Sequence, residues 1–514
     1  MNYCLNQLAQ EVSNISVDPS FQQDALSERL ANAGILPMFG FPTRTRYLFH
    51  GRPVRANPWP PEDVVNRDLD IAISQFAPGA ETVKDGMIHT SVGVVDYRPQ
   101  GGRVDEAPNP LGPARSIGLC SSCQSVIATQ PPPASCPICL ATPQQDPGYV
   151  IANLSQPAGF RTWYGRSRDF DGVFEWTPRA SRPKMSVTQH PATPHANFEV
   201  WSDSETVYVI NDNNGRMFNF EKLTQGETWV TRQALDNAGV ANPPIDVNAG
   251  GDPRALASVK TTDVMVLGIQ CWPAGIHKSP AGETGLGVRA ALYSFGFLLR
   301  RAASDLLDVQ EERELKVGLR VLRDVAGDII GQIFMSDTLE NGAGYATILG
   351  QPAFTERLLQ YIIGTSNPTF YGFLVSPQHA GTSGRTCMTS CPDCLRDFSN
   401  LPYHSILDWR LGLDLARLSL DASVDIDFSV PYWQGVDAAA TRPYFAAMPG
   451  WSQVAFAGVQ GGQRGNIVEL IAHPLWSLDR NNLHPQLVSA RAQAEAAGNQ
   501  VRFKSLFELV RRPF

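Results

Sequence analysis

The chain has 514 residues, which corresponds to about three to four domains of ordinary size, so a single-domain protein is not expected. Hydrophobic residues make up 43% and aromatic residues 9%, enough apolar surface to build cores, which excludes a mainly disordered protein. The formal charge of −8 disfavours a protein that coats nucleic acid through its overall charge. The sequence shows no secretion signal and no apolar run long enough for a membrane span, so we expect a cytoplasmic protein without membrane contact.

The first half of the chain mixes helical and β-like patterns. The spacing of apolar residues predicts helices over residues 22–34 and 62–76. From residue 146 to 235 the pattern is β-like, and the Asn-rich turn Asn211–Gly215 between two alternating segments predicts a hairpin. The Pro- and Gly-rich stretch from Asn242 to Pro253 predicts a domain boundary.

The second half has the alternation of strands and helices that is typical of α/β proteins. The predicted elements are a buried strand over 262–269, a long helix over 285–309, paired strands over 312–322 and 328–337, helices over 352–364 and 405–421, and finally a strand, a helix and a strand over 467–473, 484–498 and 500–509.

Together these patterns predict a mixed, multidomain α+β fold. The N-terminal half is expected to be β-rich and to carry a zinc ribbon, and the C-terminal half to be an α/β zinc-binding region. We expect five units: an N-terminal α/β segment (1–110), a zinc-ribbon insertion (111–145), a β-rich domain (146–250), a zinc-binding domain (256–425) and a C-terminal α/β extension (426–514).

Seven of the nine cysteines fall into two clusters. The first cluster has two CxxC units separated by twelve residues and contains Cys120, Cys123, Cys136 and Cys139. Paired thiolates on tight turns match the tetrahedral geometry of zinc, and a site with four protein ligands has no open position for catalysis. The first cluster therefore predicts a structural Zn²⁺.

The second cluster contains Cys387, Cys391 and Cys394, which leaves one position of a tetrahedral site unfilled. A neutral imidazole can complete such a site. We expect His404 first, with His379 as the nearest alternative and Cys271 as a distant one. One or two structural zinc ions are thus expected in the chain.

Basic residues gather locally within Arg44–Arg55, Arg289–Arg301 and Arg502–Arg512. The candidate nucleic-acid contacts are Arg44, Arg46, Arg289, Arg300 and Arg301. Phosphate loops of the type GxxxxGK[ST] are absent from the sequence, so we expect no NTP-driven motor in this chain.

Carboxylates allow an alternative, a metal-dependent nuclease or phosphodiesterase acting on DNA. Its Mg²⁺ ligands would come from Asp337 and Glu340, or from the loose arrangement of Asp308, Glu314 and Lys316. Convergence of these carboxylates in one cleft would support the alternative.

The segment from about Asp263 to Leu420 carries SDTLENGAGYATI, CMTSCPDCLRDFSN and HSILDWRLGLDLA. It resembles the MrfA-type zinc-binding domain, a former domain of unknown function found at the C-terminus of superfamily 2 DNA helicases and in DISARM phage-defence proteins. Upstream, LPMFGFPTRTR, RDLDIAISQFAPG and the first cluster resemble the part that precedes this domain in DISARM-like helicase proteins. The resemblance implies a structural zinc at Cys387, Cys391 and Cys394, although related helicases usually supply a fourth cysteine that this sequence lacks.

The resemblance also implies a function. It predicts a non-catalytic accessory subunit of a superfamily 2 helicase complex in bacterial anti-phage defence, which helps to bind DNA and docks onto a helicase motor supplied by a partner chain. A motor-less C-terminal part of a split helicase is the other possibility, besides the nuclease.

Overall fold

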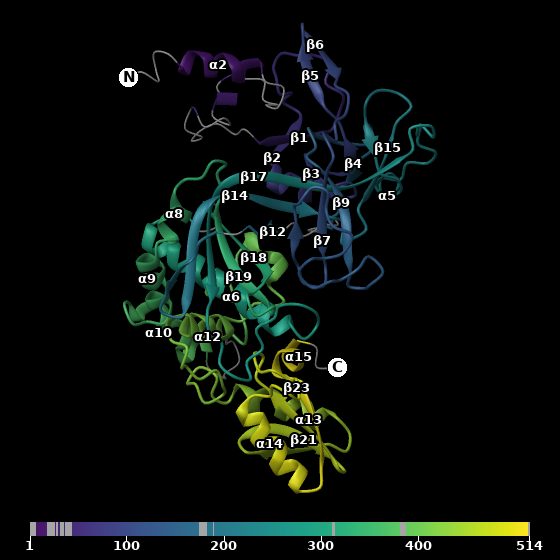
Figure 1. The fold of residues 1–514 in the computed structure, drawn as a ribbon. Coiled ribbons are helices and arrows are strands. Elements are labelled where there is room, and N and C mark those ends of the chain that lie inside the picture. Colours follow the sequence, from purple (N-terminus) through teal and green to yellow (C-terminus); the bar gives the residue numbers. More distant parts are fainter. Residues whose placement is uncertain are drawn as a thin grey trace.

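The computed structural model describes residues 7–17, 26, 29–30, 35, 44–173, 182–188, 190–310, 314–380 and 387–511. Within them, a β-rich N-terminal part, a central part with helices packed on a sheet, and a C-terminal α/β lobe follow one another along the molecule (Figure 1). The predicted mixed α+β class is confirmed. Most of the helix predicted over residues 22–34 lies outside the described residues.

Two long strands join the N-terminal and central parts. Strand β14 (Phe198–Asn211) pairs antiparallel with β17 (Gly251–Ile269) over its whole length, from Phe198 opposite Ile269 to Asn211 opposite Leu256. At its start β17 pairs with β15 (Phe218–Lys222), and nearer its end with β19 (Ile329–Asp337). The two units that the sequence places on either side of residues 250–256 therefore share a sheet.

The turn at Asn211–Gly215 is present, but its flanking strands do not form the predicted hairpin. Asn213, Asn214 and Gly215 all have positive φ angles, as a tight turn requires. Strands β14 and β15 nevertheless both pair with β17, at Leu256 and Arg254 respectively, so β15 continues in the direction of β14. The prediction was wrong because the partner strand begins about forty residues later in the sequence and the turn pattern cannot reveal it.

The N-terminal part consists mainly of short strands. Asp68 caps the start of α4 (Leu69–Gln75), so the helix predicted over 62–76 is a strand followed by a shorter helix. The other elements of this part are α2 (Leu8–Val17), β1 (Thr45–Phe49), β2 (Val64–Asp68), β3 (Glu81–Lys84), β4 (Met87–Val94), β5 (Tyr97–Gln100), β6 (Arg103–Glu106), β7 (Arg115–Cys120), β8 (Val126–Ile127), β9 (Tyr149–Ser155), β10 (Phe160–Thr162), β11 (Arg168–Asp169), β12 (Arg182–Met185), β13 (Thr193–His195), β16 (Trp229–Val230) and α5 (Arg232–Asn237).

The central part is built on the predicted long helix, α6 (Leu286–Leu307), which packs on the sheet formed by β17, β19 and β18 (Leu315–Arg323). Glycine permits this close packing, because a Cβ atom at Gly296 would lie 2.6 Å from Val317 Cγ1. Helix α12 (Trp409–Leu420) packs on the other side of α6 and is also a predicted element. The remaining elements are α8 (Tyr345–Leu349), α9 (Pro352–Ile362), α10 (Pro368–Val375), α11 (Pro377–Ala380) and η1 (Phe398–Tyr403).

The C-terminal lobe contains the predicted strand, helix and strand. Strands β22 (Ile467–Ala472) and β23 (Gln500–Ser505) pair in parallel and are connected by α14 (Pro485–Ala496), as a parallel pair requires. The last predicted strand ends at Ser505, and Leu506–Arg511 forms helix α15 because its apolar residues follow helical spacing. Helix α13 (Val436–Ala447), β20 (Ser452–Phe456) and β21 (Val459–Arg464) complete the lobe.

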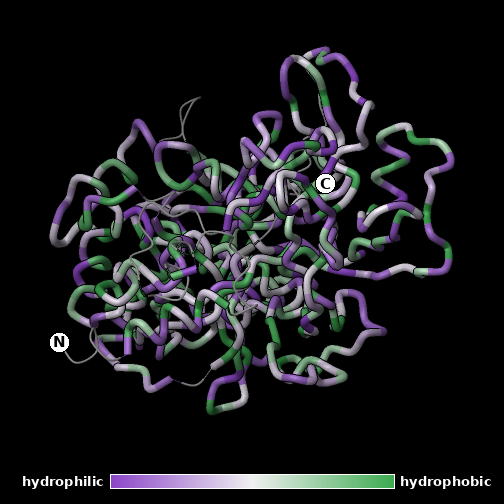
Figure 2. The backbone as a smooth tube through the Cα atoms, turned by 90° about the horizontal axis from the view of Figure 1, so that it is seen from above, coloured by the Kyte–Doolittle hydropathy of each residue, from purple (hydrophilic) through white to green (hydrophobic). Residues whose placement is uncertain are grey.

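Apolar residues are spread over many elements of the chain. Figure 2 shows short hydrophobic and hydrophilic stretches alternating along the backbone. Among the residues that the structure describes, no helix is both long and apolar enough to cross a membrane.

Candidate metal centres

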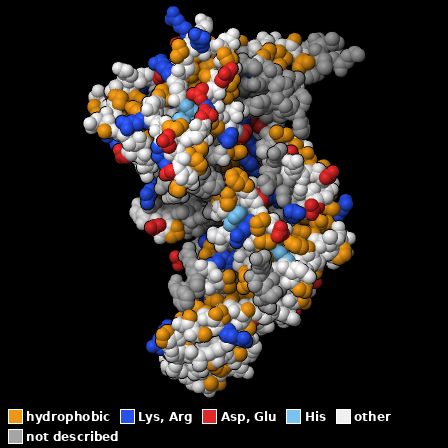
Figure 3. Space-filling model, turned by 180° about the vertical axis from the view of Figure 1, so that it is seen from behind, with side chains coloured by type: hydrophobic (Ala, Val, Ile, Leu, Met, Phe, Trp, Pro, Cys, Tyr) orange, Lys and Arg blue, Asp and Glu red, His pale blue; other side chains and the backbone are white. Residues whose placement is uncertain are grey.

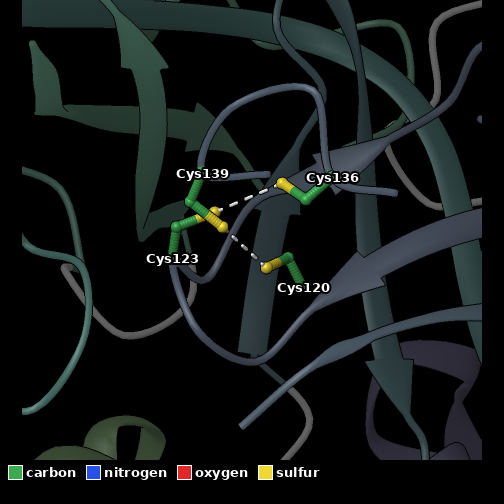
Figure 4. Close-up of side chains that lie close together, drawn as sticks. All are labelled: Cys120, Cys123, Cys136 and Cys139. Carbon is green, nitrogen blue, oxygen red and sulfur yellow. Dashed lines mark hydrogen bonds between the residues drawn. The ribbon is translucent and has the colours of Figure 1, made fainter. Parts of the chain in front are cut away.

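The first cysteine cluster forms a closed group of four sulfurs. Strand β7 ends at Cys120, and the two turns that follow direct Cys123, Cys136 and Cys139 toward it (Figure 4). The Sγ atoms of Cys120 and Cys139 are 3.5 Å apart, those of Cys123 and Cys136 are 3.6 Å apart, and all four lie within 4.8 Å of one another. Four ligands at the usual Zn–S distance would be about 3.8 Å apart at the corners of a tetrahedron, so the group fits a zinc ion.

The two CxxC turns have the same backbone shape. Gln124 and Leu140, each directly after the second cysteine of its pair, have φ angles of 66° and 64°. The Cys120 N–H donates to Ser125 O and, in the same pattern, the Cys136 N–H donates to Ala141 O, which closes each turn. Two equivalent turns that present two thiols each are the arrangement that the spacing predicts for a ribbon.

Mutual contact and burial disfavour ionisation of the Cys123 thiol in the absence of a cation. Contacts with Cys120 and Cys136, and then burial, raise the pKa of the Cys123 thiol well above its ordinary value. A bound metal ion reverses this balance, because a coordinating thiol is deprotonated. The group is therefore suited to a cation, and its four protein ligands leave no position for a substrate.

The second group contains Cys387, Cys391, Cys394 and His379, with ligand atoms that all lie within 4.8 Å of one another. The Sγ atom of Cys391 is 3.6 Å from that of Cys394 and 3.5 Å from His379 Nε2. The Sγ atoms of Cys387 and Cys394 are 3.8 Å apart. These distances again match the edges of a tetrahedral site.

His379 is oriented as a metal-ligating histidine would be. It lies on α11, is 5% exposed, and its Nδ1 lies 2.8 Å from the carbonyl oxygen of Leu374. A proton on Nδ1 donated to that carbonyl leaves the Nε2 lone pair directed at the sulfurs, which is the usual arrangement behind a ligating imidazole.

His404, the fourth ligand expected first from the sequence, is not part of this group. Its Nε2 lies 2.7 Å from Asn400 Oδ1 and 3.0 Å from the carbonyl oxygen of Asp397, which turns the ring toward η1. Cys271, the distant alternative, is exposed and also lies outside the group. The geometry thus corrects the expectation in favour of His379, the alternative that the sequence analysis left open.

Helices α6 and α12 hold the loop that carries the second group. The Trp409 N–H donates to Thr389 O, and Arg410 Nη1 donates to Met388 O at 2.9 Å. On the other side, Arg300 of α6 forms a buried ion pair with Asp397, three residues after Cys394. The metal-binding loop is therefore attached to the central core at both ends.

The arginines expected to contact nucleic acid are largely engaged inside the protein. Arg44 donates hydrogen bonds to Val259 O and to Ser258, and Arg46 donates one to Pro157 O. Burial, and then the neighbouring Arg44, lower the pKa of Arg46 to about 10. Arg289 donates to Pro280 O and Gly282 O, and Arg300 is 3% exposed in its pair with Asp397. The side chain of Arg301 is 38% exposed and lies 3.8 Å from Asp305. These contacts give Arg44, Arg46, Arg289 and Arg300 structural roles.

The carboxylates of the nuclease alternative are not brought together. Asp337 is fully buried and accepts the backbone N–H groups of Ala343, Tyr345 and Ala346, so its oxygens cap α8. Lys316 pairs with Asp70 in a buried cluster. Within the described residues, the two cysteine groups are the only sets of potential ligands that converge, and no such set includes Asp308, Glu314, Asp337 or Glu340.

A basic pocket in the C-terminal lobe was not predicted as a site. It is lined by Arg480, Arg491 and Arg502, of which only Arg502 falls in a segment that the sequence marks as basic. A signal was nevertheless present, because residues 426–514 contain eight Lys or Arg against six Asp or Glu, whereas residues 1–425 contain 34 against 44.

Comparison with known proteins gives a weak structural likeness. No protein-family model matches the chain, and no curated protein matches it. Among solved structures, it is similar to the DUF1998 helicase MrfA bound to DNA, with 10% sequence identity and a TM-score of 0.33 over 73% of this chain and 33% of that chain. The structure of DUF1998 helicase MrfA bound to DNA and AMPPNP gives 10% identity and a TM-score of 0.22 over 63% of this chain and 35% of that one. The chain thus spans about a third of the helicase chains that it matches, and TM-scores this low carry no argument about its activity.

Proposed function

We propose that this chain is a zinc-stabilised, non-catalytic accessory subunit of a superfamily 2 DNA helicase complex, acting in the cytoplasm in bacterial anti-phage defence. The observation that carries the proposal is the closed group of His379, Cys387, Cys391 and Cys394. Its three cysteines belong to the same CMTSCPDCLRDFSN segment that resembles the zinc-binding domain of such helicases.

Zinc is the metal that the donor atoms favour. Thiolate sulfur and imidazole nitrogen in a tetrahedral arrangement suit Zn²⁺, whereas Mg²⁺ and Ca²⁺ require oxygen ligands in larger coordination shells. Both groups have four protein ligands, so the metals would stabilise the fold and activate no water. The proposed activity accordingly lies in binding surfaces and not in a catalytic centre.

The helicase motor is assigned to a partner polypeptide, because the sequence contains no phosphate loop. In this proposal the chain docks onto that motor and holds DNA on one face. An overall charge of −8 is compatible with contact to DNA through a local surface, since phosphate contacts require only a few well-placed cations.

Co-purification with superfamily 2 helicases of the source organism tests the proposal. We expect the helicase to be retained at low and moderate salt by the wild-type chain and to be lost with Cys391→Ser, which removes a ligand of the second group. Cys271→Ser is the matched control, because Cys271 is exposed and belongs to neither group, and should retain the helicase. Recovery of no helicase by the wild-type chain at either salt concentration would contradict the proposed docking.

A further inference from the structure

The C-terminal lobe contains a polar pocket of about 550 Å³ between helix α14 and the edge strand β23. This volume lies within the range of about 300–1,000 Å³ that is usual for ligand sites. The residues that line the pocket include three arginines, one acid and several neutral residues: Leu478, Arg480, Arg491, Glu495, Asn499, Gln500, Val501, Arg502 and Phe503.

The cations of the pocket are only partly neutralised. Arg491 Nε donates to Glu495 Oε1 at 2.7 Å, one turn along α14. Arg480 and Arg502 are exposed, and their side chains have no hydrogen bond or ion pair within the part of the chain that the structure describes. Glu469 stands opposite Arg502 in the β22–β23 register, and it is the nearest acid on the neighbouring strand. Two arginines thus retain donors that face outward.

The surroundings of the pocket favour an anionic ligand. Residues 426–514 are the part of the chain in which basic residues outnumber acidic ones, eight to six, against 34 to 44 in the preceding residues. Figure 3 shows Lys and Arg side chains on the surface of this lobe, with few acidic ones beside them on the face in view. Several arginines on one surface of an acidic protein form a local site for phosphate, because guanidinium groups bind phosphate oxygens in pairs.

The pocket also offers an apolar floor and an open end. Val501 and Phe503 are half-buried on β23 and line the pocket together with Leu478. Within the described residues, β23 pairs only with β22, so its outer edge remains open to a chain that passes along it. A positively charged groove that follows the backbone is the feature that binds single-stranded nucleic acid without sequence preference.

We propose that this pocket binds the phosphodiester backbone of single-stranded DNA through Arg480, Arg491 and Arg502. The inference rests on the proposed function, since it supplies the DNA-holding face of the accessory subunit. It places that face on the C-terminal lobe and not on the arginines expected from the sequence, most of which are engaged within the fold.

The test is a fluorescence-anisotropy titration of a labelled single-stranded oligonucleotide with the full chain over a series of salt concentrations. The double variant Arg480→Gln/Arg502→Gln removes two cations that have no partner within the described fold, so it should fold normally. Each phosphate contact contributes about 0.7 to the slope of log K against log salt for single strands. Two lost contacts should lower the slope by about 1.4 and weaken binding by about 25-fold at about 0.1 M salt.

The matched control is Arg442→Gln/Arg464→Gln, which removes the same charge from exposed positions of the same lobe outside the pocket. It should leave the affinity within about 2-fold of the wild type and the slope unchanged, because its arginines contact no phosphate. Equal weakening by both double variants would overturn the proposal, since only a diffuse charge effect would then be present.

Further outcomes separate the pocket from the proposed function. If the wild-type chain binds no oligonucleotide, the DNA-holding role and the pocket both fail. If the wild-type chain and the pocket variant bind the oligonucleotide equally well, only the pocket assignment fails. The pocket assignment also fails if the pocket variant keeps the oligonucleotide but no longer retains the helicase. Displacement of the oligonucleotide by a mononucleotide or by inorganic phosphate, at an equal concentration of phosphate groups, would refute the proposal that the ligand is the backbone of a polymer.

Discussion

Removal of His379 is the sharpest test of the second metal centre. We expect His379→Ala to lower the zinc content of the purified chain from two ions to one, because three sulfurs remain from a group whose four ligand atoms lie within 4.8 Å of one another. The first group, which shares no ligand with the second, should keep its ion.

The expected loss of metal affinity and of stability in His379→Ala follows from the surroundings of the imidazole. Changes behind a metal ligand usually weaken metal binding by about 10- to 100-fold, and loss of the ligand itself should cost at least as much. At a fixed free zinc concentration this corresponds to about 1.4 to 2.7 kcal/mol or more of lost metal-linked stability. The centroid of the His379 ring also lies 4.7 Å from that of Phe373 and 5.4 Å from that of Trp409. Removal of the ring therefore also leaves a cavity at the start of α12.

The assay combines elemental analysis of protein purified without added zinc with thermal unfolding before and after chelation. His404→Ala is the matched control, since its imidazole contacts Asn400 and Asp397 but no sulfur. It should keep two zinc ions and lose about 1 kcal/mol of stability from its hydrogen bonds. His379→Cys should restore the second ion. Two ions in His379→Ala together with one ion in His404→Ala would refute the geometric assignment.

Three other predictions concern buried polar groups. Arg300→Met should destabilise the chain by about 3–5 kcal/mol in a denaturant titration, because the Asp397 carboxylate loses its ion-pair partner and keeps only hydrogen bonds from Ser399 and Asn400. The same change at the half-exposed Arg301 should alter stability by no more than about 0.5 kcal/mol, and similar values for both variants would exclude a structural ion pair. Asp337→Asn should lower the free energy of unfolding by about 1–3 kcal/mol without a change in metal content, because the amide nitrogen that replaces one oxygen cannot accept hydrogen bonds from the N–H groups of the turn. An unchanged denaturation midpoint would contradict the capping role. Burial, and then the neighbouring His89, lower the pKa of His50 to about 4. The folded state therefore excludes a proton that the unfolded state binds below about pH 6.5. Stability should fall as the pH drops from about 6.5 toward 4. Because the ring is only partly buried, we expect His50→Gln to remove about 1 kcal/mol of this pH dependence, and identical profiles for variant and wild type would argue against it.

The sequence predicts the four members of the first cysteine group, because all four come from one short segment. Two CxxC turns impose the spacing of the sulfurs locally, and the two matching φ angles at Gln124 and Leu140 show that each turn is determined by its own residues. Local patterns of this kind do not depend on distant parts of the chain.

The second centre could be predicted only in part. His379 precedes Cys387 by eight residues and His404 follows Cys394 by ten, so spacing alone does not distinguish them. The choice is made by tertiary structure: α11 brings His379 to the sulfurs, and the Asn400 side chain binds His404. No local signal reports either contact.

The arginines of α6 also depend on tertiary contacts that the sequence does not reveal. Helical spacing in the sequence places Arg300 and Arg301 next to each other at the edge of an apolar face, where both could serve as surface cations. The fold buries Arg300 against Asp397, which lies 97 residues further along the chain, and leaves Arg301 half-exposed. A contact over this sequence distance cannot be inferred from the helix itself.

The two metal centres border a single hydrophobic core, which constrains how the chain can act. Cys120, Cys123 and Cys136 belong to the same buried cluster as Cys387, Cys394 and the apolar residues of α6. The Gly282 N–H, just before α6, donates to Ser122 O within the first CxxC turn. Since both groups have a full set of protein ligands and each is joined to this core, neither leaves an open position for a substrate. Both groups are therefore placed to stabilise the core on which the surfaces of the chain depend.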